Sequence, residues 1–382
     1  YCYFFFNADQ TWRSHPPLIN LNTVRSLAQF LRQAATDFRL SRTRIVLHGG
    51  EPLMMKPATL EKLCATLRGA ETEDYKLDIT LQTNGVLITE EWISVFERNR
   101  IGVGVSLDGD RSVNDRHRFD KKGRSSYDGV VRGLRMLQAA ADIGRISPPG
   151  LLAVVQPDAD GAATYRHFAH ELGVEFIDFL LPDYTHNDLP ADAVDGVRDF
   201  TTGALRAWLA DGKRGVRVRS FSEILSALLG DDAADRAALY KNDYRHMISV
   251  SSNGDIGPED TLKILDDDFT SSGLNVARST LREVLSHPIW REQTKAAVTQ
   301  PDGCRGCTWW KICKAGRPVN RYAKENGFAN SSVFCRALKD MHAEACAFLV
   351  GAGVSPEVLE RRLSMGGDAG GQHNPEYMSE PA

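Results

Sequence analysis

The chain has 382 residues, 42% of them hydrophobic and 25% charged, and a formal net charge of −4 at pH 7. This length accommodates a large core, or one barrel with an appended domain, and the composition is that of an ordinary globular protein. A net charge of −4 gives no electrostatic reason to expect nucleic acid or a membrane surface as a partner, and no apolar run approaches the roughly 18 residues of a membrane span.

Short β-branched runs alternate with amphipathic stretches in the first part of the chain. The predicted strands are residues 44–48, 77–82, 102–107, 151–156 and 176–181. The predicted helices between them are residues 58–68, 90–98, 127–141 and 162–172. This spacing predicts parallel βαβ units, and each strand ends in polar or glycine-containing residues, the edge where barrel enzymes keep their chemistry.

The periodicity changes after residue 229. A helix, a short strand in VRVRS and another helix are expected within residues 192–229, and residues 246–251 and 255–258 then form a predicted hairpin around Asn253-Gly254. A last helix is expected over residues 335–350. We therefore expect domains at 1–229 and 230–350, followed by a helix remnant and a disordered tail at 351–382.

Four of the seven cysteines lie close together, at Cys304, Cys307, Cys313 and Cys335. Four thiolates from one short segment are what an iron–sulfur cluster or a zinc ion requires, and sulfur ligation alone does not separate the two metals. Cysteines that cluster rather than pair are typical of a reducing cytoplasm, so disulfides or inert thiols are the weaker alternative.

The first residues of the chain favour an iron–sulfur protein over a zinc protein. The run YCYFFFN resembles the end of the radical S-adenosylmethionine (SAM) signature C-x3-C-x-aromatic-C, with Cys2 as its third cysteine. That resemblance implies two further cysteines and a first strand before residue 1, without which the [4Fe–4S] cluster that cleaves SAM could not be held. Later motifs follow the same family in order: Gly49-Gly50-Glu51-Pro52, Thr83-Asn84-Gly85 and Ser106-Leu107-Asp108-Gly109.

Over nearly its whole length the chain thus resembles radical SAM proteins with a C-terminal SPASM domain. The resemblance implies an α/β fold, namely a partial (β/α)6 TIM-like barrel followed by an iron–sulfur SPASM domain. It also implies that SAM is bound by Tyr3, Gly49, Gly50, Glu51, Pro52, Thr83, Asn84, Ser106 and Asp108, with Arg118 pairing the SAM carboxylate. A solvated loop charge is the alternative for Arg118.

The four late cysteines match the position of an auxiliary [4Fe–4S] cluster in this family. A first auxiliary cluster is not expected, because Glu259 and Arg317 stand where that site has cysteines. Asp260 stands where the related anaerobic sulfatase maturases place a catalytic aspartate, and the alternative for it is a turn residue bonding its own backbone.

Residues 179–186, 255–265, 281–288 and 320–335 resemble maturases that form three-residue cyclophanes in ribosomal peptides. The implied activity uses a 5′-deoxyadenosyl radical to join an aromatic ring of a precursor peptide to a nearby β-carbon. Asp260 would be the base and the auxiliary cluster the electron acceptor, with flavodoxin or ferredoxin as an electron donor. Three alternatives stay open: oxidation of Cys or Ser to formylglycine, a peptide-binding protein without the SAM cluster, and a zinc-ribbon module.

Overall fold

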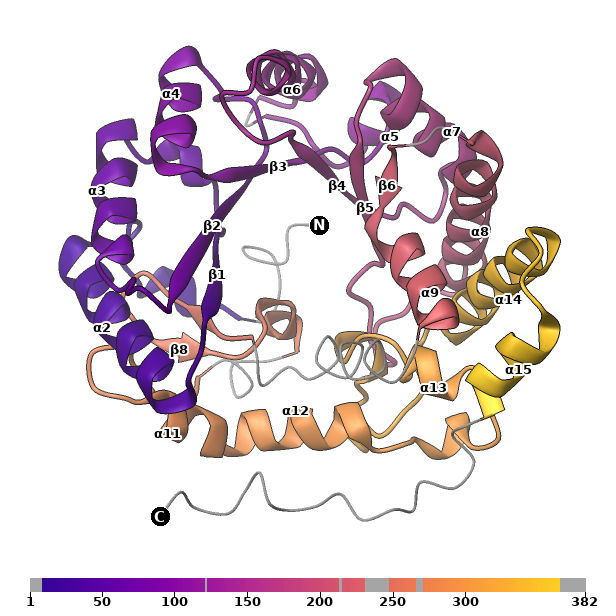
Figure 1. Cartoon of the computed structure of the whole chain (residues 1–382). Helices are drawn as coiled ribbons and strands as arrows, with labels where there is room; N and C mark the ends of the chain where they lie inside the picture. The colour runs from indigo at the N-terminus through magenta and orange to yellow at the C-terminus, as the bar shows by residue number, and fades with distance from the viewer. Residues whose placement is uncertain (1–8, 121, 213–214, 231–246, 266–270, 365–382) are drawn as a thin grey trace.

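The structure, a computed structural model, describes residues 9–120, 122–212, 215–230, 247–265 and 271–364. At its centre six parallel strands lie side by side in chain order and curve into an open arc, with helices around the outside (Figure 1). The strands are β1 (Arg42–Leu47), β2 (Lys76–Thr83), β3 (Gly102–Ser106), β4 (Gly150–Val154), β5 (Phe176–Leu180) and β6 (Arg217–Val218). The predicted α/β partial barrel is confirmed.

The helices of this part follow the strands in alternation. They are α2 (Leu21–Phe38), α3 (Pro57–Arg68), α4 (Glu90–Asn99), α5 (Arg111–Asn114), α6 (Tyr127–Asp142), α7 (Gly161–Arg166), α8 (Ala193–Asp211) and α9 (Arg219–Leu229). The helix predicted over 162–172 is instead α7 followed by a π-helical turn, η3 (His167–Glu171). The sixth strand of the described sheet is β6. The sequence analysis had instead obtained six barrel strands by including one strand before residue 1.

Helix α2 was missed by the sequence analysis although its start carries a clear signal. The Asn20 side chain accepts hydrogen bonds from the backbone amides of Asn22 and Thr23, which is the usual way an asparagine caps a helix. The helix ends where Arg39 adopts a φ of 50°. An Asn followed by an amphipathic run could have found this helix.

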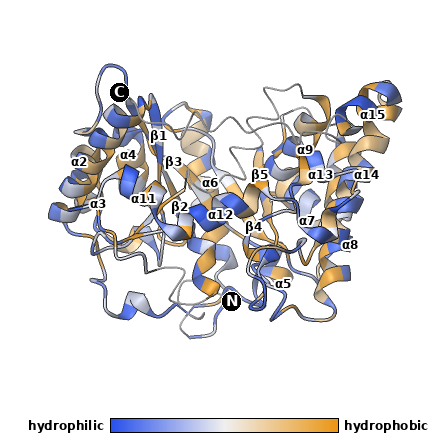
Figure 2. Ribbon diagram, turned by 90° about the horizontal axis from the view of Figure 1, so that it is seen from below, coloured by the Kyte–Doolittle hydropathy of each residue, from blue (hydrophilic) through white to orange (hydrophobic). Residues whose placement is uncertain are grey.

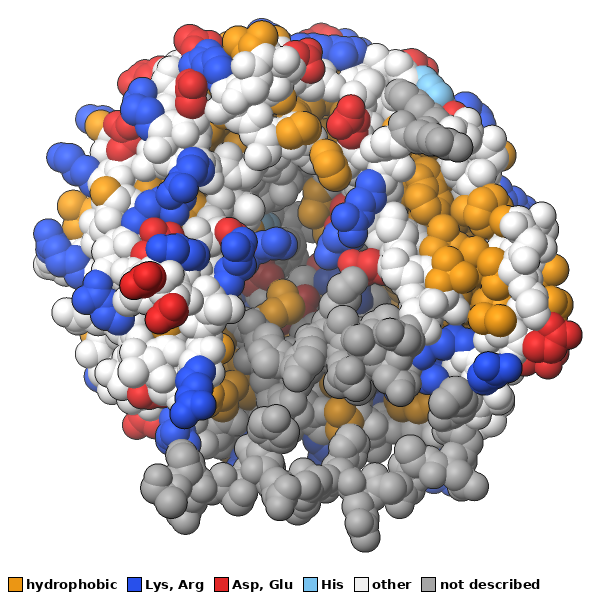
Figure 3. Space-filling model, viewed as in Figure 1, with side chains coloured by type: hydrophobic (Ala, Val, Ile, Leu, Met, Phe, Trp, Pro, Cys, Tyr) orange, Lys and Arg blue, Asp and Glu red, His pale blue; other side chains and the backbone are white. Residues whose placement is uncertain are grey.

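Each strand turns one set of side chains toward the helices and the other toward the inside of the arc. In β2 the buried set is Leu77, Ile79, Leu81 and Thr83, and the less buried set is Asp78, Thr80 and Gln82. The surrounding helices carry mixed hydrophobic and hydrophilic residues along their length, as amphipathic helices do (Figure 2). On β2 the side chains that face the inside of the arc are therefore polar, and Lys and Arg side chains border the central opening in Figure 3 together with acidic and hydrophobic ones.

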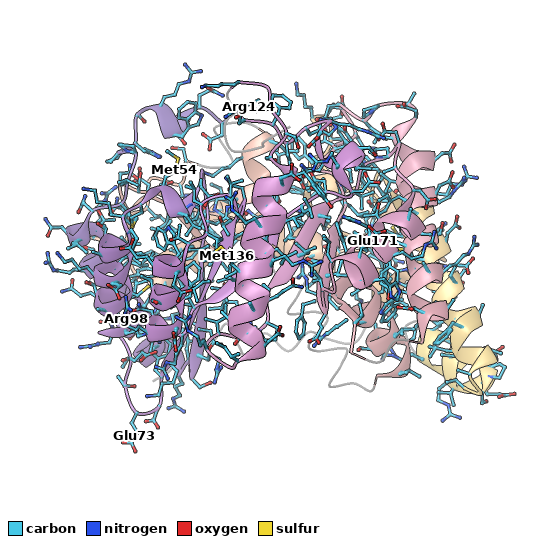
Figure 4. The ribbon with its side chains drawn as sticks, turned by 90° about the horizontal axis from the view of Figure 1, so that it is seen from above. Met54, Glu73, Arg98, Arg124, Met136 and Glu171 are labelled. Atoms are coloured by element: carbon cyan, nitrogen blue, oxygen red, sulfur yellow. The ribbon has the colours of Figure 1, made fainter. Side chains whose placement is uncertain are left out.

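The two ends of the arc are distinguished by which loops lie there. Met54 in the loop after β1 and Arg124 in the loop after β3 lie at one end of the molecule, and Glu73 in the loop before β2 lies at the other (Figure 4). The motifs at 49–52, 83–85 and 106–109 follow β1, β2 and β3, so they share the first of these ends. This is the end where a barrel of parallel strands carries its chemistry.

The remaining chain begins with the predicted hairpin, which is confirmed as antiparallel strands β7 (Ser249–Val250) and β8 (Ile256–Gly257). The helices that follow are α11 (Leu281–Ser286), α12 (Pro288–Val298), α13 (Trp310–Cys313), α14 (Cys335–Gly351) and α15 (Pro356–Ser364). Short 3₁₀ helices are η1 (Thr11–Arg13), η2 (Pro52–Met54), η5 (Asp260–Ile264), η7 (Asp302–Cys304) and η8 (Val319–Arg321).

The hydrophobic core does not divide at residue 230. Its main cluster extends from Val24 to Met341, and α14 packs against α8 of the barrel. The helix predicted over 335–350 is confirmed as α14. The domain limits at 229 and 350 stay a prediction, and residues 365–382, at the end of the predicted tail, lie outside the described residues.

Candidate functional site

The loop after β1 is fixed by the carboxylate of Glu51. Its Oε1 accepts hydrogen bonds from the Thr83 hydroxyl (2.6 Å) and the Leu53 amide (3.0 Å), and its Oε2 accepts one from the Asn84 amide (2.8 Å). Gly49 and Gly50 have φ values of 88° and 49°, which suit glycine. Glu51 thus ties the loops after β1 and β2 together, and its direct contact with SAM stays a prediction.

Ser106 at the end of β3 is held by a neighbour from β2. The Gln82 side chain crosses β3 and donates a hydrogen bond to the Ser106 hydroxyl at 2.8 Å. It can do so because residue 104 is glycine, where a Cβ would lie 2.2 Å from Gln82 Oε1. The sequence analysis selected Ser106 but not the glutamine that orients it.

Asp108 and Arg118 form a bidentate ion pair. Arg118 donates from Nε to Asp108 Oδ2 at 2.7 Å and from Nη2 to Oδ1 at 3.0 Å, and the amide of Val154, the last residue of β4, donates to Oδ1 at 3.1 Å. The Asp108 side chain is 1% exposed, whereas that of Arg118 is 22% exposed. Asp108 is therefore placed to orient Arg118, and the solvated-loop alternative for Arg118 does not describe this structure.

Replacing Arg118 with methionine should lower the free energy of unfolding by about 3–5 kcal/mol, because it leaves a buried carboxylate without its partner. Equilibrium urea unfolding measures the change. The double variant Asp108→Asn/Arg118→Met should recover part of the loss, because the amide carries no charge. If the Arg118→Met variant is as stable as the wild type, the ion pair with Asp108 does not stabilise the fold, and the role of Arg118 is limited to binding a ligand.

The four late cysteines line one cavity. Its other lining residues are Trp309, Trp310, Ala315, Ser331, Ser332, Leu338 and Lys339. Cys304 ends η7, Cys313 ends α13 and Cys335 begins α14, so three separate elements bring the thiols together. The two tryptophans border the cavity beside the thiols.

Burial raises the pKa of the Cys313 thiol to about 12, and the neighbouring Cys335 adds to the rise. Burial also raises the pKa of Cys304 and of Cys335, and Lys339 opposes both shifts. Without a metal these thiols therefore stay protonated, and bound cations would have to displace the protons. By contrast Cys64 is fully buried in α3, away from this cavity.

An iron–sulfur cluster and a single zinc ion make different demands on the four thiols. A single zinc needs its sulfurs about 2.3 Å from one centre, whereas an iron–sulfur cluster spreads four thiolates around a larger body. In the described part of the chain, no three His, Cys, Asp or Glu side chains are gathered in a way that could hold one metal ion. Metal analysis of the purified chain therefore separates the two.

Asp260 begins η5 beside two other carboxyl groups, Glu259 and Asp183, and the guanidinium of Arg317. Arg317 Nη1 lies 2.9 Å from Asp183 Oδ1, and Nη2 lies 3.7 Å from Glu259 Oε1. Glu259 and Arg317, the two residues that stand in place of cysteines of a first auxiliary cluster, thus form an ion pair with each other.

The loop after β5 is tied to the segment between Cys313 and Cys335. Asn320 donates hydrogen bonds to the carbonyls of Pro182 (2.8 Å) and Tyr184 (2.9 Å), and the His186 amide donates to the Tyr322 carbonyl. The segments 179–186 and 320–335, which resemble one family in sequence, therefore pack on each other. His186 is held in this contact through Ser331, and Asp183 through Arg317.

The N-terminal part of the described chain reaches the same region. Asp9 is buried, its amide donates to the Lys263 carbonyl (3.1 Å), and its carboxylate lies 3.6 Å from Lys263 Nζ. Lys263 belongs to η5, the helix that Asp260 begins. Cys2 and Tyr3 lie outside the described residues, so their predicted roles stay predictions.

The family model described as the radical SAM superfamily matches residues 1–145. These residues are a radical SAM domain. Their motifs at 49–52, 83–85 and 106–109 stand at the strand ends where the sequence analysis expected them. None of the helices among the described residues is long and apolar enough to cross a membrane.

Curated relatives extend beyond the radical SAM domain. A cysteine-type anaerobic sulfatase-maturating enzyme of Clostridium novyi is 20% identical over 351 residues, 89% of each chain. A serine-type anaerobic sulfatase-maturating enzyme of Klebsiella aerogenes is 32% identical over 184 residues, 47% of this chain and 42% of that protein.

Solved structures of anSMEcpe share the fold. The structure with bound AdoMet superposes with a TM-score of 0.73 and 21% identity, covering 87% of this chain and 90% of that chain. The structure with bound AdoMet and the Kp18Cys peptide has a TM-score of 0.70 at the same identity and coverage.

Proposed function

We propose that the chain is a radical SAM enzyme that oxidises a side chain of a peptide, and that the product is formylglycine made from Cys or Ser. The observation that carries the proposal is the similarity to a cysteine-type sulfatase-maturating enzyme over 89% of both chains. This reverses the order of the two enzyme activities in the sequence analysis, where cyclophane formation came first.

The described residues fit the auxiliary cluster and part of the SAM site, and Cys2 lies outside them. The thiols of Cys304, Cys307, Cys313 and Cys335 would hold an auxiliary [4Fe–4S] cluster in their common cavity, and Cys2 would contribute to the cluster that works with SAM. The glycine turn at 49–50 and the partly exposed Arg118 are suited to the amino-acid part of SAM. When bound, these groups would supply hydrogen-atom abstraction and one-electron oxidation.

The chain's own residues would handle the remaining proton. Oxidation of a serine to an aldehyde removes one hydrogen atom, one proton and one electron, and Asp260 is the residue that we assign to the proton. From a cysteine the same loss gives a thioaldehyde, which water converts to the aldehyde with release of hydrogen sulfide. A carboxylate near a buried cationic group can serve as a general base if it reaches the proton. The tryptophans and Leu338 would keep water from the auxiliary cluster and so influence its potential.

Cyclophane formation is a second candidate, because a specific observation favours it. It requires the same loss of one hydrogen atom, one proton and one electron, with a ring C–C bond in place of the aldehyde. Glu259 and Arg317 form an ion pair at positions where SPASM proteins with a first auxiliary cluster have cysteines. The cyclophane maturases that the chain resembles also lack a complete first auxiliary site. A ribosomal peptide would then be the substrate, with a flavodoxin or ferredoxin as donor.

Mass spectrometry of peptides modified anaerobically separates the two products. A Cys- or Ser-containing sulfatase peptide should gain an aldehyde that reacts with a hydrazide probe while its backbone fragments normally. Loss of two hydrogens from a peptide encoded beside the gene, with no fragmentation across three residues that include an aromatic, would identify a cyclophane instead. If neither peptide is modified while SAM is cleaved, both proposed products are wrong.

A further inference from the structure

The inner face of the arc carries arginines at both of its edges. Arg42 and Arg44 belong to β1 at one edge, and Arg217 and Arg219 stand at the other, where β6 passes into α9. Residues along a strand alternate between the two faces of a sheet, and residues paired across parallel strands share a face. Arg44 pairs with Asp78, which β2 turns toward the inside of the arc. Both arginines of β1 therefore face the interior.

The register of the sheet carries this inner face across to β6. Gln82 belongs to the inward-facing set of β2. Four pairs lead from it to the last strand, namely Gln82 with Gly104, Gly104 with Gly150, Gly150 with Phe176, and Phe176 with Arg217. Arg217 therefore faces the same interior as the arginines of β1, from the opposite edge.

Between the two edges the inner face includes bare backbone, at Gly102 on β3 and Gly150 on β4. Among the described residues, a Cβ added at Gly150 would come within 4 Å only of Phe176, with a nearest distance of 3.5 Å. This is an ordinary contact, so packing within the sheet does not require glycine at position 150. A glycine inside a strand often marks a place where a ligand or another backbone approaches closely. The middle of the inner face is therefore suited to a peptide backbone.

Apolar side chains on this face are exposed, although they belong to the sheet at the centre of the molecule. Val46 of β1 is 52% exposed and Phe176 of β5 is 43% exposed. Both lie on the inner face, because Val46 pairs with Thr80 and Phe176 pairs with Arg217. Figure 3 shows the molecule hollowed at the centre of the arc. The described side chains thus leave this face open to a ligand.

Two of the four arginines are held by carboxylates of neighbouring strands. Arg42 Nη1 donates to both carboxylate oxygens of Asp78, at 2.9 and 3.0 Å. Arg219 Nε donates to Asp178 Oδ2 at 2.9 Å, and Glu223 of α9 adds a further negative charge near Arg219. These two guanidinium groups are therefore already engaged within the fold.

Arg44 and Arg217 are the other two arginines, one at each edge of the arc. Both residues are exposed, and within the described part of the chain neither side chain forms an ion pair or a hydrogen bond. A guanidinium keeps its charge at every physiological pH, and its planar donors match the geometry of a carboxylate. An anionic ligand that lies between β1 and β6 could therefore be contacted from both sides.

We propose that this inner face binds an acidic segment of the peptide substrate, and that Arg44 and Arg217 receive its Asp or Glu side chains. The inference rests on the proposed function for its peptide and adds the charge that the peptide should carry. A nucleic acid fits less well, because a chain with a net charge of −4 repels a polyanion, whereas two well-placed guanidinium groups still bind individual carboxylates.

The geometry also predicts where the acidic residues stand in the peptide. Arg217 pairs with Phe176 at the start of β5, and the loop that carries Asp183 follows Leu180 at the end of this strand. A strand rises about 3.3 Å per residue, so the two ends of β5 are ~13 Å apart. An extended peptide covers this distance in about four residues. The acidic side chains should therefore lie about four or five residues from the side chain that is oxidised.

Fluorescence anisotropy with a dye-labelled hexaglutamate peptide tests the proposal without SAM or a reductant. Wild-type protein should bind this probe and should not bind the matching hexaglutamine peptide. Arg44→Gln and Arg217→Gln should each weaken binding about 2–5-fold, the usual effect of losing one exposed ion pair. Higher salt should weaken the binding of the wild type as well, because it screens exposed charges.

Arg25→Gln is the matched control, since it replaces an exposed arginine of α2, outside the arc. It should leave the affinity for hexaglutamate unchanged, and circular dichroism should show that all three variants are folded. Wild-type affinity in both Arg44→Gln and Arg217→Gln would overturn the proposal. Equal binding of a single-stranded oligonucleotide with the same number of charges would show a general polyanion site and would overturn the assignment to a peptide.

The binding test and the proposed function can fail separately. If hexaglutamate binds through the two arginines but no sulfatase peptide is oxidised, the acidic-peptide site stands and the proposed product is wrong. If sulfatase peptides are oxidised with the same KM whether glutamate or glutamine stands four or five residues from the target, and Arg44→Gln does not change that KM, the proposed function stands and the acidic-peptide site is wrong.

Discussion

Replacing Cys313 with alanine is expected to remove about four irons and their sulfides from each anaerobically reconstituted chain. The reason is that a four-thiolate site is emptied by loss of one ligand, and Cys313 lines the cavity shared with Cys304, Cys307 and Cys335. Iron and acid-labile sulfide assays measure the loss, together with the visible charge-transfer band.

Cys346→Ala is the matched control for this experiment. Cys346 lies on α14 like Cys335, but it packs in a small apolar cluster with Leu228 and Leu359 and does not line the cavity. Its replacement should leave the iron content unchanged. Loss of zinc rather than iron from Cys313→Ala would establish the zinc-ribbon alternative, and unchanged metal content would refute both.

Replacing Asp260 with asparagine is expected to lower product formation by about 10²–10⁴-fold, the usual contribution of a general base. Reductive cleavage of SAM should continue, because Asp260 is assigned to the later proton transfer and not to SAM. Liquid chromatography of 5′-deoxyadenosine and of the peptide product measures the two steps in one reaction.

Asp37→Asn is the control, since it changes an exposed carboxylate on α2 that accepts a hydrogen bond from the Gln33 side chain at 2.8 Å. It should alter neither step. Equal losses of SAM cleavage and product in Asp260→Asn would place the residue in SAM binding or folding, and full product yield would exclude it as the base. In either case the proton acceptor would have to be sought elsewhere at the barrel mouth.

Much of the barrel could be predicted from the sequence because strand and helix periodicities are local. The β-branched runs at 77–82 and 102–107 became β2 and β3 with shifts of one residue or less at each end. The cysteine cavity was also predictable, since close spacing limits where thiols can point. Helix α2 was missed because its signal is a cap at Asn20 rather than a motif.

Contacts between distant segments could not be read from the sequence. Arg118 was chosen to bind a ligand, but nothing in the sequence shows that Asp108, ten residues earlier, would hold it by two hydrogen bonds. Likewise Glu259 and Arg317 were each noted for the cysteine that they replace. Their pairing arises only when the hairpin and the loop after α13 fold against the end of β5.

The hydrogen bonds from Asn320 to the loop after β5 are expected to link cluster assembly to protease resistance. Asn320 lies between the proposed ligands Cys313 and Cys335, so cluster insertion would shorten the effective length of the segment that holds this loop. Limited proteolysis of the metal-free chain should therefore cut within residues 182–187 sooner than in the loaded chain. Maturation of the enzyme would then finish at its substrate entrance, and a chain that has not received its iron would be the one that quality-control proteases recognise.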